Sequence, residues 1–188
     1  MIITKPLHAV AVAVFAFAVL VGPAGAADLP NPGETVILTI GGAVTRSNRG
    51  APDHFAASFL KTQEYDYTKA AAFDVPMLER LGMVKTTIKA APWPRAITLE
   101  GPRLVDVLMA AGWNGTKITM VALDGFAVEI SAADIAAREW IVGIKADGAY
   151  LPIGGRGPVW IVYQVPGGQG TEEDEARWPW AVFYISAE

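Results

Sequence analysis

The stretch KITMVALDGFAVEI, residues 117–130, constrains the fold more than any other part of this 188-residue chain. Apolar and polar residues alternate on both sides of the pair Asp124-Gly125, and a period of two is typical of strands with one buried face. An Asp-Gly pair favours the two-residue turn that joins antiparallel strands. The stretch therefore predicts a β-hairpin. A second Asp-Gly pair, at 147–148, predicts another hairpin within residues 140–153.

Further strands and short helices surround these hairpins. Strands are expected at 34–44, 83–91, 159–163 and 178–185, where apolar residues alternate or run together. The segment 53–72 has helical stretches but no clean period. Because hairpins, single strands and short helices follow one another without a regular order, the sequence predicts one α+β domain with mixed sheets.

The segment 74–82, DVPMLERLG, predicts a helix with recognisable ends. Asp74 suits the N-cap position because its carboxylate can accept a hydrogen bond from a free backbone N–H. Pro76 suits the first turn, and Gly82 suits the left-handed residue that follows a helix.

Two other helices are predicted from similar features. One covers 102–112, with Pro102 expected at the first helical position and Gly112 after the last. The other begins at 131–134, where SAAD resembles a capping box. The segment 166–177, PGGQGTEEDEAR, is predicted to be a flexible, solvated acidic loop instead.

Residues 1–26 predict a signal peptide. Lys5 precedes an apolar run, and the run ends near Ala24-Gly25-Ala26, which has the small-x-small form of a cleavage site. A membrane anchor is the alternative, but the run is shorter than the ~20 residues of a spanning helix. We therefore expect a secreted, periplasmic protein with an extended N-terminus over 27–33 and one domain over 34–186.

The charge of the chain excludes one class of partner. Removal of residues 1–26 leaves 14 basic and 19 acidic side chains, a net charge of −5. Binding to nucleic acid requires clustered cations that neutralise phosphates, and the sequence has no such cluster. We expect no nucleic-acid partner.

The absence of cysteine excludes several kinds of site. An exported chain without cysteine has no disulfides, so its core alone must hold the fold. Thiol nucleophiles, iron–sulfur clusters and cysteine–zinc sites are excluded as well. After processing, His54 is the single histidine, so a histidine-rich metal site is excluded and a Ser-His-Asp triad would have to use His54.

The candidate ligand site centres on the loop GGRG, residues 154–157. A strand follows this loop, whereas phosphate-binding glycine loops are followed by a helix, so a nucleotide fold is not indicated. Gly155 and Gly157 would let backbone N–H groups approach an acceptor, and Arg156 presents a planar fork of donors. Asp124 is a further candidate. A role in a surface turn is the alternative for both Arg156 and Asp124.

Tryptophans provide candidate walls for such a site. Trp93 and Trp178 lie beside prolines in rigid loops, where an indole can offer a flat face to a heterocycle, and Trp160 can do the same from the start of its strand. Packing over a sheet edge is the alternative. Trp140 and Trp180 are expected in the core.

Four segments together resemble the oxidoreductase molybdopterin-binding domain, which has the sulfite oxidase fold. They are TLEGPRLVDVLMAAGW, ALDGFAVEISAADI, IVGIKADGAYLPIGGRGPVWIVYQVP and RWPWAVFYI. The resemblance covers roughly residues 34–186 and rests on the order and spacing of these segments. It implies that the glycine–proline loop and the next strand line a pterin pocket, with Arg156 as hydrogen-bond donor and aromatic residues as walls.

The chain departs from the family at one important point. Catalytic members ligate molybdenum through a cysteine thiolate, and the corresponding stretch here, MVKTTIKAAPWPRAITLEG at 83–101, has none. Ligation in that manner is therefore lost. The chain is also similar to the small, secreted, single-domain branch of the fold. The resemblance implies that such proteins bind pterins without metal, and that some act beside membrane sensors that make or degrade cyclic di-GMP.

Three hypotheses about function follow. The leading one is a periplasmic pterin-binding protein, a non-enzymatic signalling component that acts with the periplasmic domain of an inner-membrane sensor. The second is a molybdopterin-dependent oxidoreductase subunit whose metal is held without cysteine. The third is an interaction module with a vestigial pocket, which contacts a partner through loops such as 166–177.

Overall fold

The computed structural model describes Met1 and residues 29–188. The predicted signal peptide at 1–26 lies, apart from Met1, outside the described residues, as do the first two residues of the segment 27–33. Among the described residues, no helix has the length and apolar character needed to cross a membrane.

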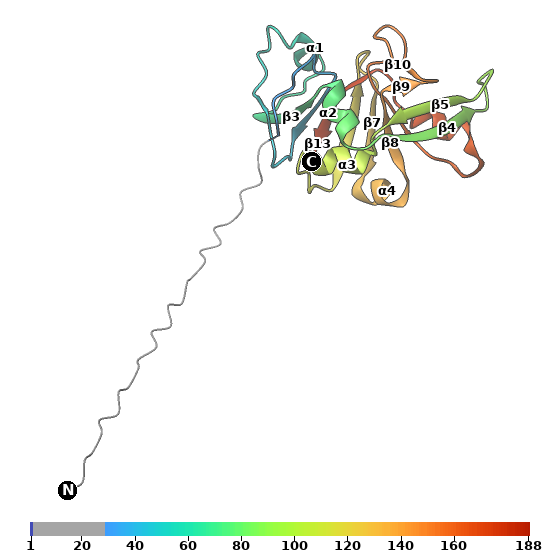
Figure 1. Ribbon diagram of the computed structural model, residues 1–188. Coiled ribbons are helices and arrows are strands. Elements are labelled where there is room, and N and C mark those ends of the chain that lie inside the picture. The colour runs from blue at the N-terminus through green and yellow to red at the C-terminus, as the bar shows by residue number, and fades with distance from the viewer. Residues whose placement is uncertain (2–28) are drawn as a thin grey trace.

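The larger sheet has six strands in the order β2-β3-β1-β13-β6-β7 (Figure 1). Their bounds are β1 (Leu38–Gly42), β2 (Arg49–Gly50), β3 (Lys69–Phe73), β6 (Lys117–Ala122), β7 (Ala127–Ser131) and β13 (Val182–Ala187). β1 runs parallel to β13, and the other neighbours are antiparallel. The hairpin predicted around Asp124-Gly125 is confirmed as β6–β7, with Met120 opposite Val128.

The second sheet has five strands in the order β10-β9-β5-β4-β12. They are β4 (Val84–Ala90), β5 (Ile97–Gly101), β9 (Lys145–Ala146), β10 (Ala149–Tyr150) and β12 (Gln169–Gly170), and β8 (Trp140–Gly143) pairs separately with β11 (Trp160–Tyr163). The β4–β5 hairpin extends away from the larger sheet, and the red C-terminal segments lie beside it (Figure 1). The predicted hairpin around Asp147-Gly148 is confirmed, but only in the short pair β9–β10.

The helices are short. They are α1 (Ser58–Thr62), α2 (Val75–Arg80), α3 (Leu104–Ala110), α4 (Ala132–Ala137), α5 (Glu172–Ala176) and the 3-10 turn η1 (Pro166–Gly168). The Asp74 cap of α2 is confirmed, because its carboxylate accepts a hydrogen bond from the Met77 N–H at 2.8 Å. The capping box at Ser131 and Asp134 is confirmed at the start of α4. The mixture of these helices with mixed sheets confirms the α+β class.

Three local predictions need correction. Arg103 is the N-cap of α3, so Pro102 precedes the helix instead of opening it. The last strand begins at Val182, because Ala181 adopts a left-handed φ of 55° that interrupts a strand starting at 178. The segment 166–177 is not one flexible loop.

In that segment, η1 is followed by the two-residue strand β12 and then by α5. The Thr171 hydroxyl accepts a hydrogen bond from the Asp174 N–H, and the Asp174 carboxylate accepts one from the Thr171 N–H. This capping box orders four consecutive acidic residues as the first turn of a helix, where negative charge favours the helix dipole.

The larger sheet separates two apolar clusters. Leu38 and Ile40 belong to the main core, where no part of either side chain is exposed. On the opposite face, next to Gly41, the rings of Tyr67 and Tyr184 stack with centroids 6.0 Å apart. The alternation along β1 therefore directs side chains into both layers, as the period of a strand requires.

Candidate ligand site

Arg156 lies against a group of indole rings. Its guanidinium carbon is 4.3 Å from the ring centroid of Trp160, 5.2 Å from that of Trp93 and 5.9 Å from that of Trp180. Attraction between a cation and an aromatic face explains the association of an arginine with tryptophans in this glycine-rich loop. The loop brings the cation to the rings because Arg156 O accepts a hydrogen bond from the Ala181 N–H, just before β13.

The guanidinium of Arg156 has no hydrogen-bond acceptor and no ion-pair partner among residues 29–188. The side chain is half-buried, and this burial lowers the pKa of Arg156, while the negative charge of Glu175 acts in the opposite direction. Burying a cation without a partner is costly, whereas a ligand acceptor in the plane of the guanidinium would satisfy its donors.

Behind Arg156, the aromatic residues form a continuous cluster. Trp93 contacts both Trp160 and Trp178, with centroid distances of 5.3 and 6.0 Å, and Tyr163 lies 5.6 Å from Trp178 and 4.7 Å from Trp140. All five side chains are buried. Trp93 and Trp160 therefore pack the core beneath Arg156 and do not present an open face to a ligand. The expectation of Trp140 in the core is confirmed.

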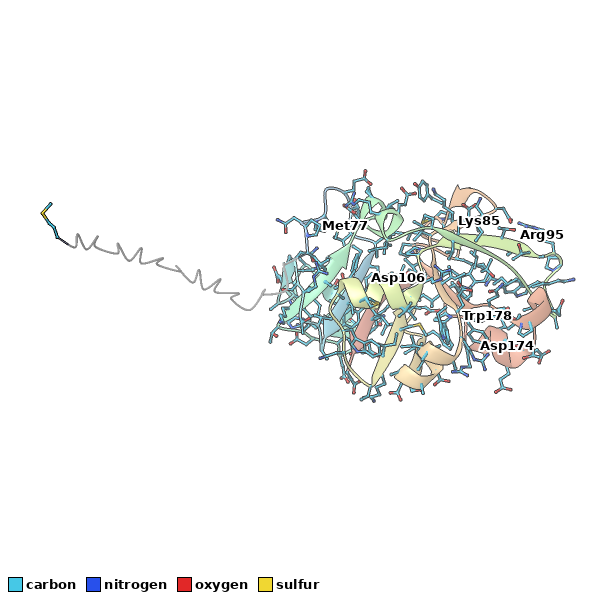
Figure 2. All side chains as sticks on the ribbon, turned by 60° about the horizontal axis from the view of Figure 1, so that its bottom comes forward. Met77, Lys85, Arg95, Asp106, Asp174 and Trp178 are labelled. Atoms are coloured by element: carbon cyan, nitrogen blue, oxygen red, sulfur yellow. The ribbon has the colours of Figure 1, made fainter. Side chains whose placement is uncertain are left out.

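Trp178 is placed by the pairing of two sheet segments. β12 runs parallel to β4, with Gly170 opposite Ala90, and a Cβ at Gly170 would lie 2.4 Å from the Trp178 ring. The ring thus packs directly on the backbone of β12. Figure 2 shows Trp178 and Asp174 at the same end of the molecule, away from Met77 of α2.

A cavity of about 400 Å³ opens beside this cluster. Its lining residues are Asp124, Phe126, Glu172, Glu175, Ala176, Trp178 and Trp180. Trp180 and Phe126 are 43% and 50% exposed, so the cavity has accessible aromatic faces. The expectation that Trp180 lies in the core is wrong. It precedes β13, and the left-handed Ala181 that follows it ends the alternation of a strand.

The polar lining of this small cavity is acidic. The Asp124 carboxylate accepts a hydrogen bond from the Phe126 N–H at 3.0 Å, as an aspartate in a turn commonly does. Glu175 accepts a hydrogen bond from the Trp93 indole N–H. Glu172 has no side-chain hydrogen bond within residues 29–188. Each carboxylate thus keeps at least one oxygen free to accept a hydrogen bond from a ligand.

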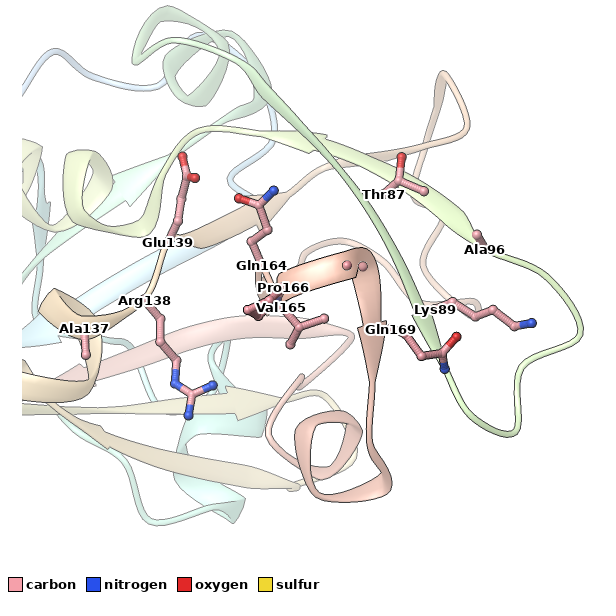
Figure 3. A pocket seen from close by; sticks show the side chains of 12 residues that line it. Thr87, Lys89, Ala96, Ala137, Arg138, Glu139, Gln164, Val165, Pro166 and Gln169 are labelled. Carbon is pink, nitrogen blue, oxygen red and sulfur yellow. The ribbon is translucent and has the colours of Figure 1, made fainter.

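A second, larger cavity of about 1060 Å³ lies between β4 and the segment from Ala137 to Glu139. Figure 3 shows Lys89 and Gln169 on one side of it, Arg138 and Glu139 on the other, and Gln164 between them. It is a wide groove with a mixed polar and apolar lining. Lys89 belongs to the stretch 83–101. By the sequence resemblance, this stretch corresponds to the region that carries the cysteine in catalytic members of the family.

The charges of the large cavity differ from those of the small one. Glu139 is paired with Arg103 at 2.7 Å, and the Arg138 guanidinium lies 4.3 Å from the Tyr163 ring centroid. Lys89 is half-buried and makes no side-chain hydrogen bond or ion pair in the part of the chain that the structure describes. Lys89 therefore leaves this groove with an uncompensated positive charge.

The structure brings some of the predicted site residues together and separates others. Asp124 and Trp178 line the same small cavity, and Arg156 lies next to its wall through Trp180. Gly155 is exposed on the loop surface. Gly157 is buried, and a Cβ there would lie 2.2 Å from Leu151 O, so close packing of backbone on backbone explains this glycine without a ligand.

Sequence reasoning missed Trp180 and Glu175 as cavity residues and Lys89 as an unpaired cation. For Trp180 the sequence pattern did not distinguish a buried ring from an exposed one. In Trp178-Pro179-Trp180, the two indoles lie two residues apart around a proline, and one exposed ring was as compatible with that pattern as two buried ones.

Comparisons with known proteins identify a similar fold but no matching family. No family model matches, and no curated protein matches. A crystal structure of the sulfane dehydrogenase SoxCD from Paracoccus pantotrophus matches with a TM-score of 0.52 at 16% sequence identity. The match covers 80% of this chain and 37% of that one, so the chain spans little more than a third of its length. The fold is similar to a sulfite-oxidase-like domain, as predicted.

The side chains of neither cavity fit a protein-ligated molybdenum ion. The soft thiolate ligand is missing, since the chain has no cysteine. Within the described residues, no group of three or more histidine, aspartate or glutamate side chains could hold a metal ion. Any molybdenum would have to be held by its cofactor alone.

Proposed function

We propose that this protein binds a metal-free pterin reversibly in the small cavity lined by Asp124, Trp178 and Trp180. One observation carries the proposal. The guanidinium of Arg156 is half-buried beside this cavity and has no partner within residues 29–188, although three indole rings surround it. A planar, polar heterocycle matches this combination of an unsatisfied donor fork and accessible aromatic faces.

The chemistry of a pterin suits both kinds of polar group at the cavity. Its pyrimidine edge carries an amino group and a ring N–H. A carboxylate such as that of Asp124 or Glu172 can accept hydrogen bonds from both. Its carbonyl oxygen and ring nitrogens are acceptors for Arg156. The ring can stack on the exposed face of Trp180, and stacking of a nucleobase-like ring on an aromatic side chain contributes ~1–3 kcal/mol.

Calorimetric titration of the mature protein with reduced and oxidised pterins tests the proposal. Arg156→Ala should weaken binding by about 1.5–3 kcal/mol, the range for hydrogen bonds to a charged group. Arg156→Lys should restore only part of this, because an ammonium cannot present a planar fork. Arg95→Ala is the matched control, since Arg95 is exposed and pairs with Asp147. Equal affinity of Arg156→Ala and the parent would refute the proposed site.

We propose further that the protein acts in the periplasm as a signalling component, with the periplasmic domain of a membrane cyclic di-GMP sensor as partner. The apolar segment before Ala24-Gly25-Ala26 and the resemblance to small secreted members of the fold support this. Mass spectrometry of exported protein should find Ala27 or a near neighbour as the first residue. An intact Met1 in the periplasmic fraction would contradict export with cleavage.

The large cavity favours a second candidate, a molybdopterin-binding oxidoreductase subunit. Unpaired Lys89 on one side of the groove, or Arg138 on the other, could hold the phosphate of molybdopterin, while the cofactor would supply the redox chemistry. Elemental analysis separates the two functions. About one molybdenum per chain, retained after dialysis, would favour the second. Absence of any small molecule after extraction, together with failure of every pterin to bind, would favour an interaction module.

A further inference from the structure

We infer that the small cavity selects pterins whose substituents carry no negative charge. This inference rests on the proposed function, because it concerns which member of the pterin class the same cavity accepts. It is based on the negative charge of the residues that line the cavity. A pterin could bind in the cavity without this charge, so the inference goes beyond the proposed function.

Three of the seven residues that line the small cavity are acidic, and none is basic. They are Asp124, Glu172 and Glu175. Within residues 29–188, no lysine or arginine forms an ion pair with any of them. Asp124 and Glu175 accept hydrogen bonds only from uncharged donors, the Phe126 N–H and the Trp93 indole N–H, so the negative charges remain.

Arg156 compensates this charge only in part. It interacts with Glu175 at a distance too long for an ion pair, and it lies next to the cavity, 5.9 Å from the Trp180 ring centroid, without lining it. One cation against three carboxylates leaves the cavity region net negative. An anionic ligand group placed there would be repelled, and repulsion between charges a few ångströms apart near a protein surface amounts to a few kcal/mol at most.

The same carboxylates favour the uncharged pterin head. Hydrogen bonds that an ionised carboxylate accepts are about twice as strong as those between neutral groups. The amino and N–H edge of the ring is therefore attracted to the walls that repel a phosphate or carboxylate substituent. The large cavity has the opposite character, with Lys89 uncompensated, so anionic pterins are suited to that groove instead.

The test compares two ligands that share one ring system. Mature protein is titrated with 6-hydroxymethylpterin, which is uncharged, and with 6-carboxypterin, which is anionic. We expect the uncharged pterin to bind at least about tenfold more tightly, a difference that corresponds to ~1.4 kcal/mol. The ratio should shrink when salt is raised from about 20 to about 300 mM, because salt screens exposed charges.

Charge-removing variants locate the effect. Glu172→Gln and Asp124→Asn should each bring the affinity for 6-carboxypterin closer to that for 6-hydroxymethylpterin by about threefold or more, a shift of ~0.6 kcal/mol or more. Glu173→Gln is the matched control, since Glu173 belongs to the same helix but does not line the cavity. Melting temperatures of all variants show whether each is folded.

The outcomes separate the inference from the proposed function. Equal affinity of the parent for both pterins would overturn the charge selection and leave the pterin site standing. If Glu173→Gln changed the ratio of the two affinities as much as Glu172→Gln does, the charge selection could not be assigned to this cavity. Failure of both pterins to bind would overturn the proposed function and the inference together.

Discussion

The guanidinium carbon of Arg156 lies 4.3 Å from the ring centroid of Trp160, four residues further along the chain. The glycine–proline loop thus folds back so that its cation rests on the first residue of the strand that follows it. This relationship gives Arg156 two roles. Its contact with the Trp160 ring supports the loop, and its N–H donors remain free for a ligand.

Arg156→Ala should lower the free energy of unfolding by about 0.5–2 kcal/mol, the range of cation–π contacts from exposed to desolvated sites. Urea unfolding followed by tryptophan fluorescence measures this. Arg156→Met keeps an apolar chain over Trp160 and separates packing from charge. A methionine variant as stable as the parent would show that the cation contributes nothing to the contact, and an unchanged alanine variant would contradict the contact altogether.

Local features of the fold could be predicted from the sequence because neighbours along the chain determine them. The Asp124-Gly125 hairpin, the Asp74 cap and the Ser131 capping box each depend on one short continuous stretch of the chain, and all three are present. The Thr171 capping box was equally local. It was missed because the acidic run was interpreted by its charge instead of its spacing.

The site could be predicted only in part, because it depends on contacts between distant segments. Trp93 and Trp160 meet across 67 positions of sequence, and β12 reaches β4 by a parallel pairing that no local pattern encodes. Arg156 could be predicted as a candidate because it is the single cation in a glycine-rich loop. That its partners are buried indole faces, and that Trp180 is the exposed ring, follows only from the folded arrangement.

Asp74 joins the N-terminal segment to α2, and its replacement should destabilise the fold. Its carboxylate accepts hydrogen bonds from the N–H groups of Met77, Gly33 and Glu34 at 2.8, 2.7 and 3.0 Å. Asp74→Ala should cost about 2–4 kcal/mol, since an N-cap alone is worth about 0.5–2 and the two other hydrogen bonds add to it. Chemical denaturation measures the loss, and a change below 0.5 kcal/mol would contradict it.

The same carboxylate should make stability depend on acidity. Burial raises the pKa of Asp74, but hydrogen bonds from three backbone N–H groups outweigh burial and hold the pKa below its ordinary value. A lowered pKa in the folded state means that the stabilisation is complete above the unfolded value of ~3.9 and is lost as the pH falls through the folded pKa. Asp74→Asn should flatten the acid limb of the stability profile. An identical acid limb in parent and variant would refute this assignment.

Gly41 should not tolerate alanine. A Cβ at this position would lie 2.5 Å from the Tyr184 hydroxyl oxygen and 2.8 Å from Cδ1 of Tyr67, closer than atoms can pack. Gly41→Ala should therefore cost about 1–3 kcal/mol, as overpacking of a core commonly does. Gly50→Ala is the control, because a Cβ there has no atom within 4 Å. Thermal unfolding compares the two, and equal melting temperatures would contradict the close packing on this face of the sheet.

Tyr163 should resist ionisation at alkaline pH. Burial, together with its hydrogen bond to Asp174, raises the pKa of Tyr163 to about 12. A raised folded-state pKa means that the stabilisation is complete below the unfolded value of ~10 and is lost as the pH rises through the folded pKa. Tyr163→Phe removes the hydroxyl, so this variant should be less stable at neutral pH by about 1–3 kcal/mol, because the Asp174 oxygen loses its donor.

The free energy of unfolding of Tyr163→Phe should fall less than that of the parent between about pH 10 and pH 12, because the variant has no phenol at this position to ionise. Ultraviolet titration of the phenol groups, with denaturation curves at each pH, provides both measurements. Tyr150→Phe is the control for an exposed phenol. If Tyr163→Phe and the parent lost stability in parallel over this alkaline range, Tyr163 would have to ionise as readily in the folded chain as in the unfolded one, and its burial against Trp140 and Trp178 would have no electrostatic consequence.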